Sequence, residues 1–149
     1  MATKLEFDFP MFKKLQKQLE EIGGNALDEA VDKALTESDK FVTMQLETAI
    51  SEHTKPNGKY SNGDTLKSLD RTIEIVKTGF EYSDVVGFDI EHGGLPSIFL
   101  MYGTKVHGQP HITPDKKLYN AIYGTATKKK VQEIQAQAFF EMIEKVMKK

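Results

Sequence analysis

An apolar stripe that repeats every 3.6 residues limits most strongly what this chain can fold into. It starts after Gly23 and Gly24 and continues for about seven turns, with these members: Leu27, Ala30, Val31, Ala34, Leu35, Phe41, Val42, Leu46, Ala49 and Ile50. The period predicts one amphipathic helix over residues 25–53, with Asn25 as its N-cap. At 1.5 Å per residue this helix is about 40 Å long, so it either spans the whole body or projects beyond it.

A shorter helix and a polar loop flank this long helix. Four apolar side chains share one helical face within residues 11–22, so residues 1–24 are expected to form an N-terminal helix and a turn. Residues 54–63 (TKPNGKYSNG) hold turn-forming Pro, Asn and Gly with almost no apolar side chains, which predicts a flexible surface loop. A single helical turn over residues 64–69, capped by Asp64, is expected to follow.

Short strand signals occupy the middle of the chain. Residues 72–77 alternate between apolar and polar, and residues 80–82 and 85–90 give further short apolar segments, so we expect an antiparallel meander. The apolar run 98–102 fits either a buried strand or a short buried helix, and residues 103–114 resemble a loop.

The last helix is expected to begin at Thr113-Pro114-Asp115, where Thr113 caps and Pro114 takes the first helical position. Leu118 and Ile122 would form its buried face, and Gly124 would kink it. Because helices and strands are segregated along the chain, the predicted class is α+β. The expected architecture is a small antiparallel meander packed by a long N-terminal helix and a C-terminal helix, in a single domain over residues 1–149.

Charge is distributed unevenly along the 149 residues. Residues 1–114 hold 12 Lys and Arg against 18 Asp and Glu, a net charge of −6, whereas residues 115–149 hold 8 Lys against 4 acids, a net charge of +4. An acidic body and a basic tail favour contact between unlike surfaces, within a chain or between copies. The run Lys128, Lys129 and Lys130 is therefore either a solvated turn or an electrostatic assembly interface. With a single Arg in the chain, sequence-reading DNA binding is not expected.

No motif of catalysis or cofactor binding is present in the sequence. There is no Walker loop, dinucleotide-binding glycine motif or nucleophile elbow, and the absence of cysteine excludes disulfides and thiol nucleophiles. His107 and His111 are four residues apart, but Gly108 and Pro110 between them prevent a helix from presenting both to a metal. We therefore expect no enzyme, no cofactor and no metal. No run of about 18 apolar residues is present and the first ten residues lack an apolar stretch, so neither a membrane span nor a secretory signal is expected.

The most informative segment is residues 98–114, where an apolar element enters the turn Tyr102-Gly103-Thr104. Gly103 permits a positive φ or a close backbone approach, and Thr104 can cap the turn. Pro110 and Pro114 stiffen the connection and lower the entropy lost on ordering it. These five residues are expected to be structural and to fix the angle at which the last helix leaves the sheet.

In its order of motifs the chain resembles the minor tail component, or neck and tail-completion, family of long-tailed bacteriophages and prophages. The matching elements are Leu66-Lys67-Ser68, Val86-Gly87, Tyr102-Gly103-Thr104 and, loosely, residues 111–114, with Ile112 where an aromatic is usual. The resemblance covers roughly residues 64–124.

The resemblance implies a structural virion protein at the head–tail junction or tail end that assembles into a homo-oligomeric ring of six copies. Its implied partners are other phage neck or tail proteins, with DNA only as the passing genome. Its implied location is the virion, and the host cytoplasm before assembly. Two alternatives stay open: a small α+β bacterial binding or adaptor module that acts as a dimer, and a metal-dependent nuclease or other enzyme that uses His107, His111 and nearby acids.

Overall fold

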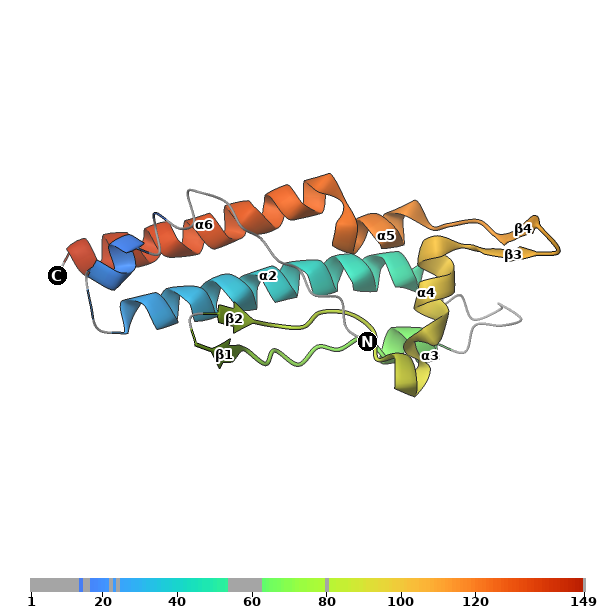
Figure 1. Cartoon of the computed structure of the whole chain (residues 1–149), viewed down its shortest axis with the longest axis horizontal. Coiled ribbons are helices and arrows are strands. Elements are labelled where there is room, and N and C mark those ends of the chain that lie inside the picture. Colours follow the sequence, from blue (N-terminus) through green and yellow to red (C-terminus); the bar gives the residue numbers. More distant parts are fainter. Residues whose placement is uncertain are drawn as a thin grey trace.

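The computed structural model describes residues 14, 17–21, 23, 25–53, 63–79 and 81–148. Two long helices, α2 (Ala26–Ser51) and α6 (Thr125–Met147), run side by side in opposite directions and give the molecule an elongated shape (Figure 1). With 26 residues, α2 is about 39 Å long. The long helix predicted from the apolar stripe is therefore confirmed, and it spans most of the body.

The stripe of α2 is the buried face of the helix, as its period predicts. Ala30, Ala34, Leu46 and Ile50 are almost completely buried. The small alanines of the first half let α6 approach closely, and the acids of the first turn favour the positive end of the helix dipole. Asn25 occupies the N-cap position as expected, but its side chain makes no capping hydrogen bond.

The core has two clusters that follow one another along α2. The first packs the first half of α2 against the last turns of α6 and Leu19, around these residues: Ala26, Ala30, Val31, Ala34, Ala138, Phe139 and Met142. The second joins the other half of α2 to the compact end of the molecule, through these residues: Val42, Leu46, Ala49, Ile50, Leu69, Val86, Phe88, Met101, Leu118, Ala121, Ile122 and Val131.

Three short helices build that compact end: α3 (Asp64–Lys67), α4 (Leu95–Tyr102) and α5 (Lys116–Tyr123). An irregular turn over Ile90–Gly94 leads into α4, with the Asp89 side chain accepting the backbone N–H groups of Glu91 and His92. Gly124 separates α5 from α6 with extended backbone angles, so the predicted kink is a complete break between two helices.

The strands form two separate antiparallel pairs. Strand β1 (Val76–Thr78) pairs with β2 (Glu81–Ser83) beside α2, and β3 (Thr104–Val106) pairs with β4 (Gln109–Ile112) in a hairpin that projects from the far end of the molecule (Figure 1). The mixed class, with antiparallel strands and two long helices, is confirmed.

The single meander is replaced by these two hairpins, because residues 85–90 do not form a strand. Gly87 has a positive φ of 143°, which interrupts the extended backbone between the buried side chains of Val86 and Phe88. Among the described residues, the backbone of this segment pairs through Asp70 N–H to the Gly87 carbonyl and Asp89 N–H to the Ser68 carbonyl, which gives the isolated Leu69–Phe88 bridge.

Other boundaries also differ from the sequence prediction. The run 98–102, which fitted strand or helix, lies in α4, and the expected loop 103–114 contains the β3–β4 hairpin. The helix start at Thr113 is wrong: α5 begins at Lys116, and Asp115 caps it by accepting the Leu118 N–H at 3.0 Å. Asp64 is the first residue of α3 and not its cap, which is Gly63. Most of the helix predicted over residues 11–22, and the loop 54–63 except Gly63, lie outside the described residues.

Candidate functional site

The Gly103 turn brings α4, the β3–β4 hairpin and α5 together in one tight junction. Gly103 has φ +73°, in the region that favours glycine, and a Cβ built on it would lie 2.6 Å from the Ile112 carbonyl oxygen and 2.8 Å from Pro114 Cδ. Beside it, the Asp115 N–H donates to the Leu100 carbonyl at 2.7 Å. Both properties expected of Gly103, a positive φ and a close approach, are present, and Pro114 is its neighbour across the turn.

Three tyrosines hold α4 against α5 at this junction. The rings of Tyr102 and Tyr119 meet edge to face with centroids 5.8 Å apart, and those of Tyr119 and Tyr123 lie 5.0 Å apart. A hydrogen bond with Tyr123 raises the pKa of the Tyr102 hydroxyl above its ordinary value. Such aromatic contacts contribute about 0.5–1.5 kcal/mol each beyond their buried area.

The remaining turn residues lie on the hairpin. Thr104 begins β3, and its buried hydroxyl has no hydrogen-bond partner among the described residues, so the capping role expected of it is absent. Pro110 stands opposite Lys105 on β4. Proline lacks a backbone N–H and is tolerated in such an edge strand.

The two histidines considered as metal ligands are spread over the hairpin. His107 lies at its tip with φ 51°, and His111 lies on β4, with both residues exposed. Within the described part of the chain, no three His, Asp or Glu side chains are grouped so that they could hold a metal ion.

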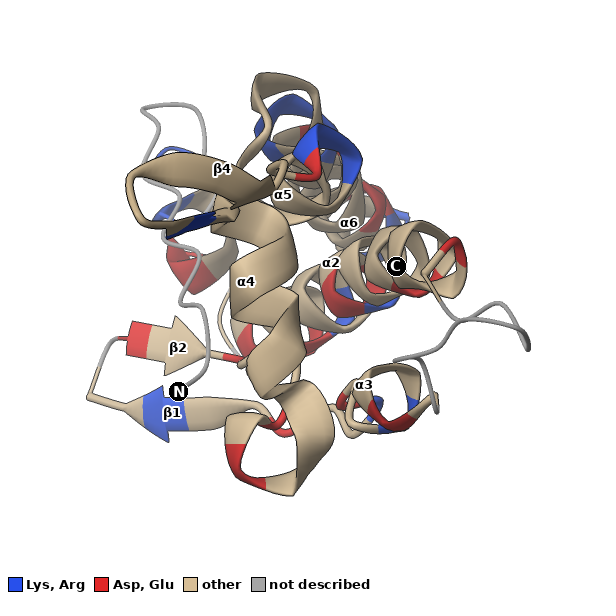
Figure 2. Cartoon of the chain, turned by 90° about the vertical axis from the view of Figure 1, so that its right-hand side faces the viewer, with Lys and Arg blue, Asp and Glu red and all other residues tan. Residues whose placement is uncertain are grey.

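An exposed apolar surface covers the end of the molecule that carries the hairpin. Leu95, Phe99 and Tyr102 repeat at i, i+4 and i+7 on one side of α4 and are 47%, 44% and 58% exposed. Tyr119 of α5 extends this surface through its contact with Tyr102, and Val106 of β3 is exposed at the same end of the molecule. Helix α4 contains no charged residue and crosses the front of this end (Figure 2). We call these five residues the end face.

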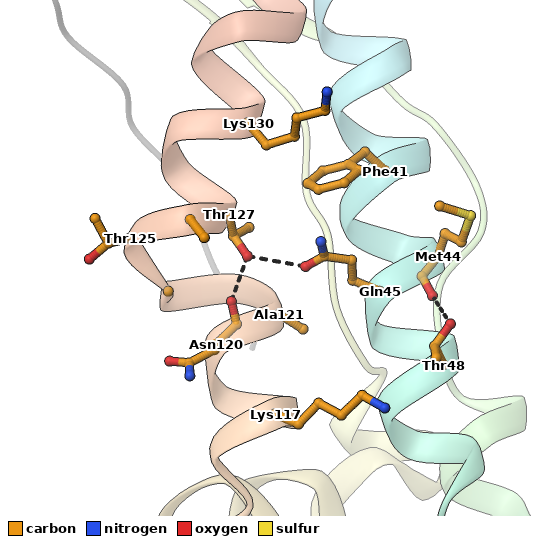
Figure 3. Close-up of a pocket in the computed structure, with 12 residues that line it drawn as sticks. Phe41, Met44, Gln45, Thr48, Lys117, Asn120, Ala121, Thr125, Thr127 and Lys130 are labelled. Atoms are coloured by element: carbon orange, nitrogen blue, oxygen red, sulfur yellow. Dashed lines mark hydrogen bonds between the residues drawn. The ribbon is translucent and has the colours of Figure 1, made fainter.

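A groove lies between α2, α5 and the start of α6. It has a volume of about 940 Å³ and is lined by 12 residues (Figure 3): Phe41, Met44, Gln45, Thr48, Lys117, Asn120, Ala121, Gly124, Thr125, Ala126, Thr127 and Lys130. One wall is fixed by the Thr127 hydroxyl, whose oxygen lies 2.6 Å from the Asn120 carbonyl oxygen and 3.1 Å from Gln45 Oε1. The sequence did not point to this groove, because its residues come from three separate segments.

The structure separates the three lysines proposed as an assembly interface. All three are exposed in the first turns of α6, but only Lys130 lines the groove. Lys128 and Lys129 lie outside the groove lining. The other groove lysine, Lys117, makes an ion pair with Glu52 at the end of α2.

A buried acid pair joins the middle of α2 to the segment after β2. Asp39 is 4% exposed, and its carboxyl accepts the Thr43 hydroxyl at 3.1 Å and faces the carboxyl of Asp84. Burial, the neighbouring Asp84 and the more distant Asp70 raise the pKa of Asp39 to about 7. Asp84 Oδ2 is buried and has no other donor among the described residues, so a proton on Asp39 can bridge the pair.

A second titratable contact lies at the C-terminal end of α2. His53 Nε2 lies 2.5 Å from Asp115 Oδ2, next to the cap of α5. Burial acts to raise the pKa of Asp115, but the hydrogen bonds from His53 and from the Leu118 N–H outweigh it, so the pKa is lowered. This contact links the ends of α2 and α5 and leaves Asp115 charged near neutral pH.

Comparison with known proteins gives no match: no protein-family model, no curated protein and no solved structure is similar to this chain. None of the helices in the described residues combines the length and the hydropathy needed to cross a bilayer. The candidate functional surfaces are the apolar end face and the groove. Among the described residues that line the groove, the charged ones are two lysines.

Proposed function

We propose that this chain is a structural virion protein of a tailed bacteriophage or prophage, acting at the head–tail junction or tail end by assembling into a ring of six copies. In this proposal it is a component of the virion and is held in the host cytoplasm before assembly. The order of motifs supports it, since the Tyr102-Gly103-Thr104 turn lies between an apolar helix and the final helical segment, as the resemblance to neck and tail-completion proteins implies.

The observation that carries the proposal is the end face. Monomeric proteins rarely leave several large apolar side chains exposed side by side, because their hydration is unfavourable and they promote association. Here Leu95, Phe99 and Tyr102 leave one side of α4 uncovered, although the opposite side buries Met101 in the core. A partner that covers this side would remove apolar surface from water at about 25 cal/mol per Å².

A ring also needs a second, different patch on the same subunit, because a cyclic arrangement brings unlike surfaces together head to tail. The basic start of α6, with Lys128, Lys129 and Lys130, provides such a patch on a chain whose first 114 residues are acidic. Other phage neck or tail proteins would be bound through the free faces of the ring. DNA would pass through the lumen without being read.

The size of the particle tests the proposal most directly. Native mass spectrometry over a concentration series, with negative-stain microscopy, is expected to show a species of about six times 16.8 kDa. Phe99→Glu places a charge on the end face and should weaken assembly tenfold or more, since central aromatics dominate interface energies. Phe140→Glu is the matched control, because Phe140 of α6 is also 44% exposed but lies outside the end face.

Two results would overturn the proposal. One is a chain that stays monomeric at every concentration and does not co-assemble with an isolated tail tube end. The other is a closed dimer that does not grow further, which favours the adaptor module. If Phe140→Glu and Phe99→Glu impair assembly equally, the end face has no special role.

A further inference from the structure

The groove between α2, α5 and α6 is shaped for an elongated apolar segment. Phe41 and Met44 line its α2 side, where the Met44 side chain is 60% exposed. On the opposite wall, the small side chains of Ala121 and Ala126 leave room for an occupant. Along α2 the groove extends from Phe41 to Thr48, a distance of about 10 Å at 1.5 Å per residue.

The charges of the groove select for an acidic occupant. Lys130 and Lys117 lie at its two ends (Figure 3), and none of the 12 described lining residues is acidic. Lys117 is partly neutralised by Glu52, whereas no ion pair of Lys130 is present among the described residues. An occupant therefore needs apolar side chains for the floor and carboxylates that reach the lysines at each end.

Residues 5–9 of this chain (LEFDF) have that composition. Leu5, Phe7 and Phe9 alternate with Glu6 and Asp8, so an extended backbone presents the apolar side chains on one face and the carboxylates on the other. Its length from Leu5 to Phe9 is about 13 Å at 3.3 Å per residue, which is about 3 Å longer than the groove along α2. These residues lie outside the described part of the chain.

The described stretches that mix aromatic and acidic residues are engaged in the body. In α6, Phe139 is buried in the core and Glu141 is paired with Lys33. Phe88 is buried in the core beside Asp89, whose carboxylate contacts His92. Tyr82 and its neighbour Glu81 belong to β2, where the Tyr82 hydroxyl bonds to Asp28. Residues 5–9 are thus the acidic and apolar segment that can supply an occupant.

We propose that the groove binds residues 5–9 of a neighbouring copy of this chain, with Glu6 and Asp8 paired to Lys117 and Lys130. The inference rests on the proposed ring, because a segment of one copy in the groove of the next is a head-to-tail contact that closes a cycle. The contact would also explain why Met44 is exposed in a single copy.

Exchanging the charges between the two surfaces tests the pairing. The first variant carries Glu6→Lys and Asp8→Lys, and the second carries Lys117→Glu and Lys130→Glu. Each alone brings like charges together and is expected to weaken assembly about tenfold or more in sedimentation velocity. An equimolar mixture restores it, because each arm then meets a groove of opposite charge.

The controls separate charge at the groove from charge in general. Lys128→Glu with Lys129→Glu reverses two charges on the same helix outside the groove and should assemble as the wild type does. Circular dichroism checks that each variant is folded. If the double groove variant does not fold, Lys130→Glu alone takes its place, since no ion pair involving Lys130 is lost within the described residues.

Peptide binding makes failure of this inference distinguishable from failure of the ring. A fluorescent peptide of residues 4–13 should bind the full-length chain in an anisotropy titration, and about tenfold more weakly to the groove variant. If the wild type is monomeric, the ring is overturned while the peptide still decides the groove. The inference is overturned if the peptide does not bind or is insensitive to groove charge. It is equally overturned if the equimolar mixture does not restore assembly while one chain that carries all four charge changes regains stability. That result would mean that each chain fills its own groove.

Discussion

Replacing Asp39 by Asn should change how the stability of this protein depends on pH. In the folded chain the pKa of Asp39 is raised from 3.8 to about 7 by burial and by the facing Asp84. Between these two values the folded state keeps a proton that the unfolded state loses, so the free energy of unfolding falls by about 1.4 kcal/mol for each pH unit gained. Above about pH 7 both states are ionised and the loss is complete.

The amide introduced by Asp39→Asn has no proton to lose, and its geometry suits the site. Its NH₂ group can donate to the Asp84 carboxylate, while its oxygen can accept the Thr43 hydroxyl as the Asp39 carboxyl does now. The shift spans about three pH units, so at pH 8 Asp39→Asn should be more stable than the wild type by on the order of 2–4 kcal/mol. At pH 4 the two chains should differ little.

Urea unfolding followed by circular dichroism at pH 4, 5, 6, 7 and 8 measures this difference, and titrating groups that do not interact with Asp39 cancel between the two chains. Asp32→Asn is the matched control, because Asp32 is exposed on the same helix. The carboxyls with lowered pKa, such as Asp28 and Glu141, lose their contribution as the pH falls below about their ordinary values, and they do so in the wild type and in Asp39→Asn alike. Equal pH profiles for the wild type and Asp39→Asn would refute the buried-acid reasoning.

Two further substitutions test the junction at the compact end. Gly103→Ala should lower the free energy of unfolding by roughly 1–3 kcal/mol because of the positive φ, and by more because the new Cβ would clash with the Ile112 carbonyl. Gly108→Ala is the control, since Gly108 also has a positive φ but open space around it, and should show the backbone strain alone. If both variants lose the same Tm, the close approach at Gly103 does not contribute to stability. Asp115→Ala removes the cap of α5 and the His53 contact and should lower the free energy of unfolding by about 1–2 kcal/mol at pH 7. The difference from the wild type should shrink in acid as Asp115 is protonated, and a difference that persists unchanged in acid would argue against a charged cap.

The long elements were predictable from the sequence because their burial is periodic. The stripe that ends at Ile50 fixed the length and the buried face of α2, and Leu118 and Ile122 correctly gave the inner face of α5. Short elements were less predictable, since the strands of three or four residues depend on tertiary contacts. Residues 85–90 look like a strand in sequence, but the positive φ of Gly87 interrupts the extended backbone between Val86 and Phe88.

The surfaces that could carry function were only partly visible in the sequence. Asp39 gave a usable signal, because it lies between Leu35 and Val42 on the apolar stripe and so had to face the core. The groove gave none, since Phe41, Asn120 and Lys130 come together only when three helices pack. Two residues of the end face, Phe99 and Tyr102, lie in an apolar run that was expected to be buried, although one side of α4 faces outward.

Among the described residues, the β3–β4 hairpin projects from the two-helix body, and the tight junction of Gly103 and Pro114 lies at its base. From Thr104 to His107 it extends roughly 10 Å at about 3.3 Å per residue. A molecule bound at the tip would consequently be held at a defined distance from the helices. Because the base is tightly packed, a force on the tip would be transmitted to α4 and α5. The hairpin would therefore act as a spacer of fixed length, and lengthening it by two residues on each strand would increase that distance without altering the core.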